Sequence, residues 1–127
     1  MAVGMSAATI NALLDAIFNA EEYVIDSAWV QLHIGDPGAN GTANGATETT
    51  RKLCPMGAAS GGSISNNAEI EWVGIAGSED ATYFTLWDAS TGGTFIGSGE
   101  ISADAYTAGG SYVIAVGDLT VSITPAS

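Results

Sequence analysis

The chain has 127 residues, of which 46% are apolar and 13% are charged, so we expect one folded domain with a small core. Fourteen acidic residues oppose two basic ones, Arg51 and Lys52, giving a formal net charge of −12. This charge repels phosphate backbones and anionic lipid headgroups, so neither nucleic acid nor a membrane is an expected partner. The first residues lack the basic flank and cleavage site of a signal peptide, so we expect no export by that route.

One amphipathic helix is predicted near the N-terminus, with Ser6 as its N-cap. Its apolar side chains recur at the i, i+3, i+4, i+7, i+8 spacing of a single helical face. The residues of this face, our candidate oligomer or docking interface, are Ile10, Leu13, Leu14, Ile17 and Phe18. A helix this short is marginal alone. It therefore packs either on its own domain or on other subunits of a larger assembly.

The next segment, residues 28–34, alternates with a period of two and predicts a strand that carries His33 on its second face. No carboxylate or thiol stands near His33 at metal-ligand spacing, so a structural role is favoured. The loop at 35–45 has turn chemistry throughout. Asp36, Asn40 and Asn44 could offer oxygens to Ca²⁺, but they lack the spacing and closing Glu of an EF-hand loop, which favours simple turns.

The middle of the chain predicts weaker strands. Residues 49–54 indicate an edge strand that Pro55 ends. Ile64 and residues 69–73 indicate either a pair of strands or one bent strand. Glu69 and Glu71 resemble a glycosidase pair only in composition, because the alternation places both on a solvated face.

The segment 83–99 predicts a β-hairpin, because two apolar runs flank a small-residue turn at 88–93. It contains no His, Lys, Arg or Cys. Two further strands, at 111–116 and 119–124, flank an expected bulge or corner at 117–118. The single cysteine, Cys54, cannot form an intrachain disulfide, and we expect a buried thiol rather than a nucleophile. No catalytic or cofactor motif stands out, so we predict neither an enzyme nor a cofactor.

The predicted fold is mainly β. We expect an antiparallel β-sandwich, jelly-roll or immunoglobulin-like, of about seven or eight strands behind the N-terminal helix. The expected domains are residues 1–25, the helix and its connector, and residues 26–127, the sandwich. Together they would form one compact domain.

Three patches of the chain resemble a family of small virion proteins of tailed bacteriophages. The matching residues are Leu32, His33, Gly35, Asp36, Pro37 and Gly38; Trp87, Asp88, Ala89, Gly92 and Gly93; and Gly117, Asp118 and Leu119. One departure is the segment 48–52, Glu-Thr-Thr-Arg-Lys, where the family often has a Gly-Gly-x-Tyr-Ala-Arg strand. Members are described as tail-fibre-like or minor virion proteins, which implies a non-enzymatic protein of the virion assembled in the host cytoplasm.

Two functions follow as expectations. The first is capsid decoration by a homo-oligomer, with a trimer favoured on symmetry grounds and the major capsid protein or tail proteins as partners. A compact domain without a coiled-coil shaft favours this function. The alternative is a tail-fibre or tail-tip protein that binds a host glycan or surface protein through Trp29, Trp72, Trp87 and the tyrosines.

Overall fold

The longest strands of the computed structural model are β6 (Glu79–Trp87) and β7 (Phe95–Tyr106), which pair as an antiparallel hairpin. The structure describes residues 3–123 and residue 126. The turn between the strands is closed by Asp88, whose backbone N–H donates to the Thr94 carbonyl at 3.2 Å and whose carboxylate accepts from the Thr94 N–H at 2.7 Å. The hairpin predicted at 83–99 is confirmed, and β7 runs further than expected.

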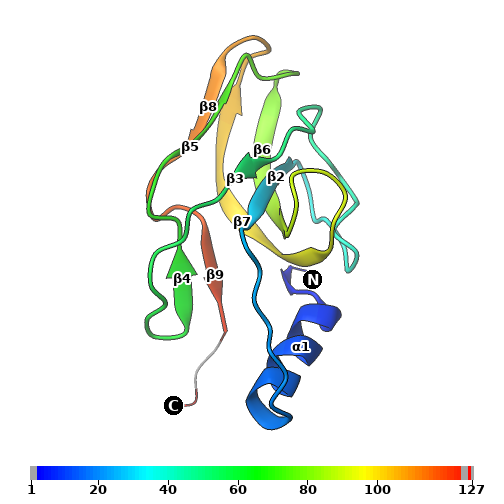
Figure 1. Ribbon diagram of the computed structural model, residues 1–127. Coiled ribbons are helices and arrows are strands. Elements are labelled where there is room, and N and C mark those ends of the chain that lie inside the picture. Colours follow the sequence, from blue (N-terminus) through cyan, green and yellow to red (C-terminus); the bar gives the residue numbers. More distant parts are fainter. Residues whose placement is uncertain (1–2, 124–125, 127) are drawn as a thin grey trace.

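This hairpin is the centre of a five-stranded sheet in the order β1-β7-β6-β2-β3 (Figure 1). β2 (Trp29–His33) pairs with β6, and β3 (Lys52–Leu53) is the edge strand predicted within 49–54. The other edge is β1 (Gly4–Met5), which precedes the helix and was not predicted. β1 lies so close to Gly97 that a Cβ there would come within 3.0 Å of the Gly4 carbonyl oxygen.

A bent two-stranded ribbon forms a second layer. It consists of two antiparallel pairs, β4 (Ser63–Ser65) with β9 (Thr120–Ser122) and β5 (Ile70–Val73) with β8 (Ser111–Ile114). Figure 1 shows the two pairs following one another. The segment predicted as a strand pair or one bent strand forms two separate strands, β4 and β5, which pair with β9 and β8 and not with each other.

Asn66 fills the break between the two pairs of this ribbon. Its side-chain oxygen accepts hydrogen bonds from the N–H groups of Gly117 and Leu119, at 3.1 and 3.0 Å. Its amide nitrogen donates to the carbonyls of Ala68 and Ala115, both at 3.0 Å. The corner predicted at 117–118 is therefore confirmed, and a buried amide holds it together.

The two layers share one hydrophobic core. Its buried members come from both the sheet and the ribbon: Val30, Leu32, Ala46, Cys54, Ile70, Trp72, Ile75, Ala81, Phe84, Leu86, Ile101, Tyr106, Tyr112, Ile114 and Leu119. Gly99 allows the Phe84 ring to lie against β7, since a Cβ at position 99 would stand 2.7 Å from the ring. A mainly β, antiparallel fold with one helix near the N-terminus is confirmed; β1 brings the described strands to nine.

Candidate assembly face and polar pocket

Helix α1 (Ala7–Phe18) is attached to the sheet through its first turn. The Ser6 hydroxyl accepts from the Thr9 N–H at 3.1 Å, which confirms the predicted N-cap. The Ser6 N–H donates to the Ile96 carbonyl at 2.8 Å and its hydroxyl donates to the Phe95 carbonyl at 3.0 Å. Thr9 is the buried residue of this helix. The last turns therefore extend away from the sheet (Figure 1).

The predicted apolar face of α1 is largely open to solvent. Ile17 and Phe18 are 70% and 76% exposed, Ile10 and Leu14 are 44% and 48% exposed, and Leu13 is half-buried. This face borders an apolar groove of about 450 Å³. The residues that line the groove are Met5, Ile10, Leu13, Leu14, Ile17, Ser122 and Ile123. We call the helix residues Ile10, Leu13, Leu14, Ile17 and Phe18 the assembly face.

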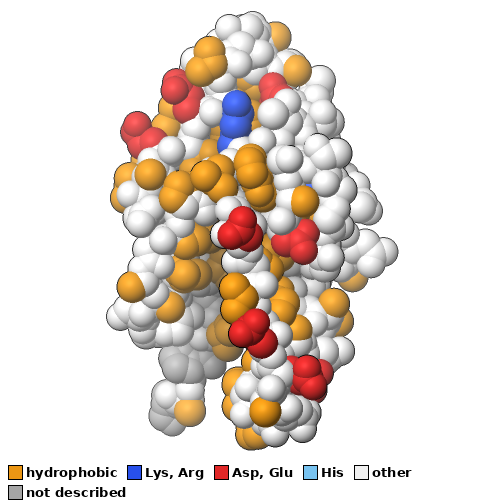
Figure 2. Space-filling model, viewed as in Figure 1, with side chains coloured by type: hydrophobic (Ala, Val, Ile, Leu, Met, Phe, Trp, Pro, Cys, Tyr) orange, Lys and Arg blue, Asp and Glu red, His pale blue; other side chains and the backbone are white. Residues whose placement is uncertain are grey.

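Packing on the chain's own domain does not cover this face in the described structure. Figure 2 shows hydrophobic side chains at the surface of the lower part of the molecule, where Figure 1 places α1. Isolated exposed apolar residues are ordinary, but several on one helical face form a patch typical of a contact with another chain. The role of the five predicted residues as an interface stays a prediction.

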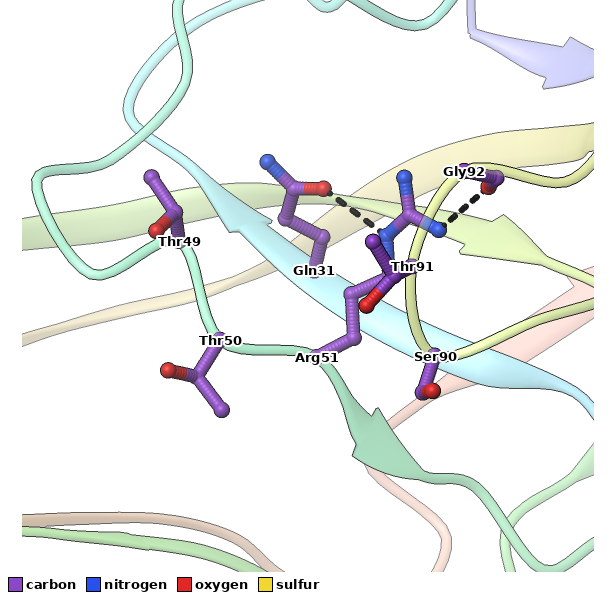
Figure 3. Close-up of a pocket in the computed structure, with 7 residues that line it drawn as sticks. All are labelled: Gln31, Thr49, Thr50, Arg51, Ser90, Thr91 and Gly92. Atoms are coloured by element: carbon purple, nitrogen blue, oxygen red, sulfur yellow. Dashed lines mark hydrogen bonds between the residues drawn. The ribbon is translucent and has the colours of Figure 1, made fainter.

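A polar pocket of about 490 Å³ lies at the edge of the sheet beside Arg51 (Figure 3). Its lining residues come from β2, from the segment before β3 and from the β6–β7 turn: Gln31, Thr49, Thr50, Arg51, Ser90, Thr91 and Gly92. Arg51 links all three segments. Its Nε–H donates to Gln31 Oε1 at 3.1 Å, and its Nη1 donates to the carbonyls of Ala89 and Gly92 at 2.9 and 2.7 Å.

The Arg51 guanidinium also lies 4.2 Å from the centre of the Trp87 ring, a cation–π contact. Burial lowers the pKa of Arg51, and the negative charge of Asp88 partly opposes this shift. The guanidinium stays protonated at neutral pH, because an arginine pKa lies far above 7. Sequence reasoning placed Arg51 on an edge strand and missed its links to the 88–93 turn. The signal that could have pointed to these links is that Arg51 is one of only two basic residues in an acidic chain.

His33 is a structural residue in the described part of the chain, as predicted. It is 1% exposed, and burial lowers its pKa. Its Nδ1 lies 2.8 Å from the Ala43 carbonyl and its Nε2 lies 2.9 Å from Thr85 Oγ1. Both ring nitrogens are therefore used within the fold.

The other candidates for chemistry lie apart from one another. Cys54 is buried, and burial raises the pKa of its thiol to about 11. A thiolate nucleophile at neutral pH does not fit this environment. Glu69 and Glu71 are exposed, as the alternation predicted, while Glu79 accepts a hydrogen bond from the Thr47 N–H at 2.6 Å.

The loop that carries Asp36, Asn40 and Asn44 is organised by its own hydrogen bonds. The Asp36 carboxylate accepts from the Gly38 N–H at 2.9 Å, and the Asn44 amide donates to the Asp36 carbonyl at 2.8 Å. Asn40 is exposed. Across residues 3–123 and 126, no three His, Cys, Asp or Glu side chains gather as a metal site would require. These contacts are the turn chemistry that the sequence favoured.

The aromatic side chains offer little surface for stacking on a sugar. Trp72 and Trp87 are 1% and 9% exposed, Tyr106 and Tyr112 are also buried, and Trp29 is half-buried. The Trp72 indole N–H donates to the Thr50 carbonyl at 2.8 Å, so its polar atom is also occupied. A glycan platform built from Trp72, Trp87, Tyr106 and Tyr112 does not fit their burial, while Trp29, Tyr23 and Tyr83 are half-buried.

Among the described residues, no helix has the length and apolar character needed to span a bilayer.

Comparison with known proteins identifies the family. A search of curated proteins found no match. A protein-family profile, described as Gp80, Podophage GP4 fiber I protein gp80, matches residues 4–122 and thus nearly the whole chain. The chain therefore belongs to this family of phage fibre structural proteins, which are virion-associated.

Proposed function

We propose that this protein is a structural subunit of a phage fibre and that copies of it assemble through the assembly face of α1. The observation that carries the proposal is the exposure of this face, with Ile17 and Phe18 70% and 76% exposed. The family favours the fibre alternative and lends no support to capsid decoration, which we expected first. A role in building the fibre needs no catalytic residue.

The charge distribution favours contact at this face. Copies with a formal net charge of −12 repel one another, but Asp15 is the one charged residue within α1. Full burial of one large aliphatic or aromatic side chain contributes about 1.5–3 kcal/mol. Several such side chains from each copy can offset the entropy lost on association. We expect a homotrimer, since fibres are commonly built with rotational symmetry.

Sedimentation equilibrium of the purified protein tests this assembly. The wild type should sediment at three times the mass of one chain. The substitutions Leu14→Asp and Phe18→Asp place a charge on the assembly face and should each weaken association about 10- to 100-fold, because about 1.4 kcal/mol corresponds to a factor of ten.

Ala8→Asp is the matched control, because it adds the same charge to an exposed position on the other side of the same helix. It should leave association unchanged, and circular dichroism should show the same fold for all four proteins. A monomeric wild type, or assembly that survives both Leu14→Asp and Phe18→Asp, would refute the role of α1. Binding to purified empty capsids with no binding to purified tails would refute the fibre placement.

A further inference from the structure

The guanidinium of Arg51 has a fixed position but unused donors. Its Nε and Nη1 bind Gln31, Ala89 and Gly92, and Trp87 packs on its face. In the described part of the chain Nη2 makes no hydrogen bond to protein. No buried side-chain nitrogen or oxygen there lacks a partner, so Nη2 must face solvent. Figure 3 shows the guanidinium held between Gln31 and Gly92.

No hydrogen bond of this guanidinium goes to a carboxylate among the contacts described above. Each of its three hydrogen bonds goes to a neutral oxygen, one from an amide side chain and two from backbone carbonyls. Asp88 acts on Arg51 through its charge, but its carboxylate accepts the Thr94 N–H of the turn. A fixed cation with two free N–H groups suits an anionic oxygen, because little side-chain freedom remains to be lost on binding.

Residues that carry hydroxyl groups line the pocket on two sides of this cation. Thr49 and Thr50 come from the segment before β3, and Ser90 and Thr91 come from the β6–β7 turn; all four residues are exposed. Figure 3 shows these two segments on either side of Arg51. A hydroxyl both donates and accepts hydrogen bonds, which matches the hydroxyls of a sugar. The pocket volume of about 490 Å³ lies within the usual range for small-molecule sites, roughly 300–1,000 Å³.

We propose that this pocket binds an acidic saccharide. The carboxylate of the sugar accepts hydrogen bonds from Arg51 Nη2, and its ring hydroxyls bond to the hydroxyls of Ser90 and Thr91. This mode differs from aromatic stacking, which the burial of Trp72 and Trp87 disfavours. The site shares no lining residue with the assembly face, so it can be tested on the monomer or the oligomer.

An NMR titration of the ¹⁵N-labelled protein with glucuronate tests this proposal. Saturable shifts should appear at the Arg51 Nε–H and at the backbone amides of Ser90 and Thr91. Glucose lacks the carboxylate and acetate lacks the hydroxyls, so each should bind at least tenfold more weakly. Arg51→Gln should abolish the shifts, and Thr91→Val should weaken binding about three- to tenfold by removing one hydrogen-bonding group.

Thr42→Val is the matched control, because Thr42 is an exposed threonine outside the pocket. It should bind glucuronate like the wild type. If Arg51→Gln fails to fold, Thr91→Val decides, since the Thr91 side chain is exposed. No saturable shift with glucuronate, equal binding of glucose or acetate, or unchanged binding by Thr91→Val would overturn the proposal.

Discussion

A chain of side-chain hydrogen bonds around His33 joins the centre of the sheet to the loop at 35–45. The Ala43 carbonyl can only accept, so His33 Nδ1 carries the proton and donates to it at 2.8 Å. His33 Nε2 then accepts from the Thr85 hydroxyl at 2.9 Å, and Thr85 Oγ1 accepts from the Trp87 indole N–H at 2.8 Å. This arrangement requires a neutral imidazole.

Protonation of His33 should therefore destabilise the fold. Burial places the pKa of folded His33 below the ordinary value of 6.5, so at mildly acidic pH the unfolded chain binds the proton more readily. The free energy of unfolding should fall as the pH drops from 6.5 towards about 5. Urea denaturation at several pH values measures this slope.

His33→Gln is the control for this pH dependence. The variant should be less stable than the wild type at pH 7, but the slope between pH 6.5 and about 5 should be smaller because the titrating group is gone. Glu48 lies outside this window, because its burial is outweighed by hydrogen bonds from the N–H groups of Ala76 and Thr50, which hold its pKa below the ordinary value of 4.5. Equal slopes for both proteins would contradict the assignment of a neutral His33.

Sequence reasoning succeeded for residues whose burial follows from the pattern of their neighbours in the chain. The alternation at 28–34 placed Val30 and Leu32 on one face of the strand, and both are fully buried. The links made by Arg51 were not predictable in the same way, because Ala89 and Gly92 stand about 40 residues further along the chain. The pairing of β3 with β2 and of β2 with β6 brings these residues together.

The bent ribbon depends on one side chain at its corner. Asn66 is 2% exposed and occupies two N–H groups and two carbonyls of the interrupted strands. Gly117, with a φ of 85°, turns the opposite strand at the same point. Each pair of strands is short, so we infer that the ribbon stays in one register because this corner fixes the offset between them.

Asn66→Ala should lower the free energy of unfolding by about 2–4 kcal/mol, because the buried Leu119 N–H would lose its partner and three part-buried hydrogen bonds would be removed. Chemical denaturation measures the change. Asn67→Ala is the matched control, since Asn67 is exposed and makes one long hydrogen bond, 3.3 Å, to the Met56 carbonyl. Asn67→Ala should lower the free energy of unfolding by less than about 1 kcal/mol. A similar loss for both variants would show that the corner has no special role.

At the scale of elements, periodicity predicted the helix and most strands, but not how the strands pair. The two-residue strand β1 has no periodicity to detect, and it forms only because Gly97 leaves space for its backbone. Strands 111–114 and 120–122 follow each other in sequence, yet they pair with β5 and β4. Such pairing depends on contacts across the whole chain, which a local pattern does not contain.

For the whole molecule, the proposed assembly sets apolar contact against charge repulsion. Each copy carries a formal net charge of −12, while the assembly face is uncharged. Salt screens repulsion between exposed charges, with a Debye length of about 10 Å at 0.1 M and about 30 Å at 0.01 M, but it does not weaken apolar burial. Association should therefore tighten as the salt concentration rises.

Sedimentation velocity in about 0.02 M and about 0.3 M NaCl tests this expectation. The dissociation constant should fall several-fold at the higher salt concentration, and the sedimentation coefficient at a fixed protein concentration should rise. Leu14→Asp should associate more weakly than the wild type at both concentrations. Association that weakens with salt would instead indicate that ion pairs hold the copies together.

The separation of the assembly face from the polar pocket has a consequence for the strength of attachment. No residue of α1 lines the pocket, so assembly through α1 alone would leave the Arg51 site of each copy open. A shallow site with one cation holds a single sugar only weakly, but linked sites on a polymer rebind at a high effective concentration. Avidity would then give a fibre a reversible hold on a repetitive acidic glycan, with subunit number increasing its strength and the net charge of −12 opposing it.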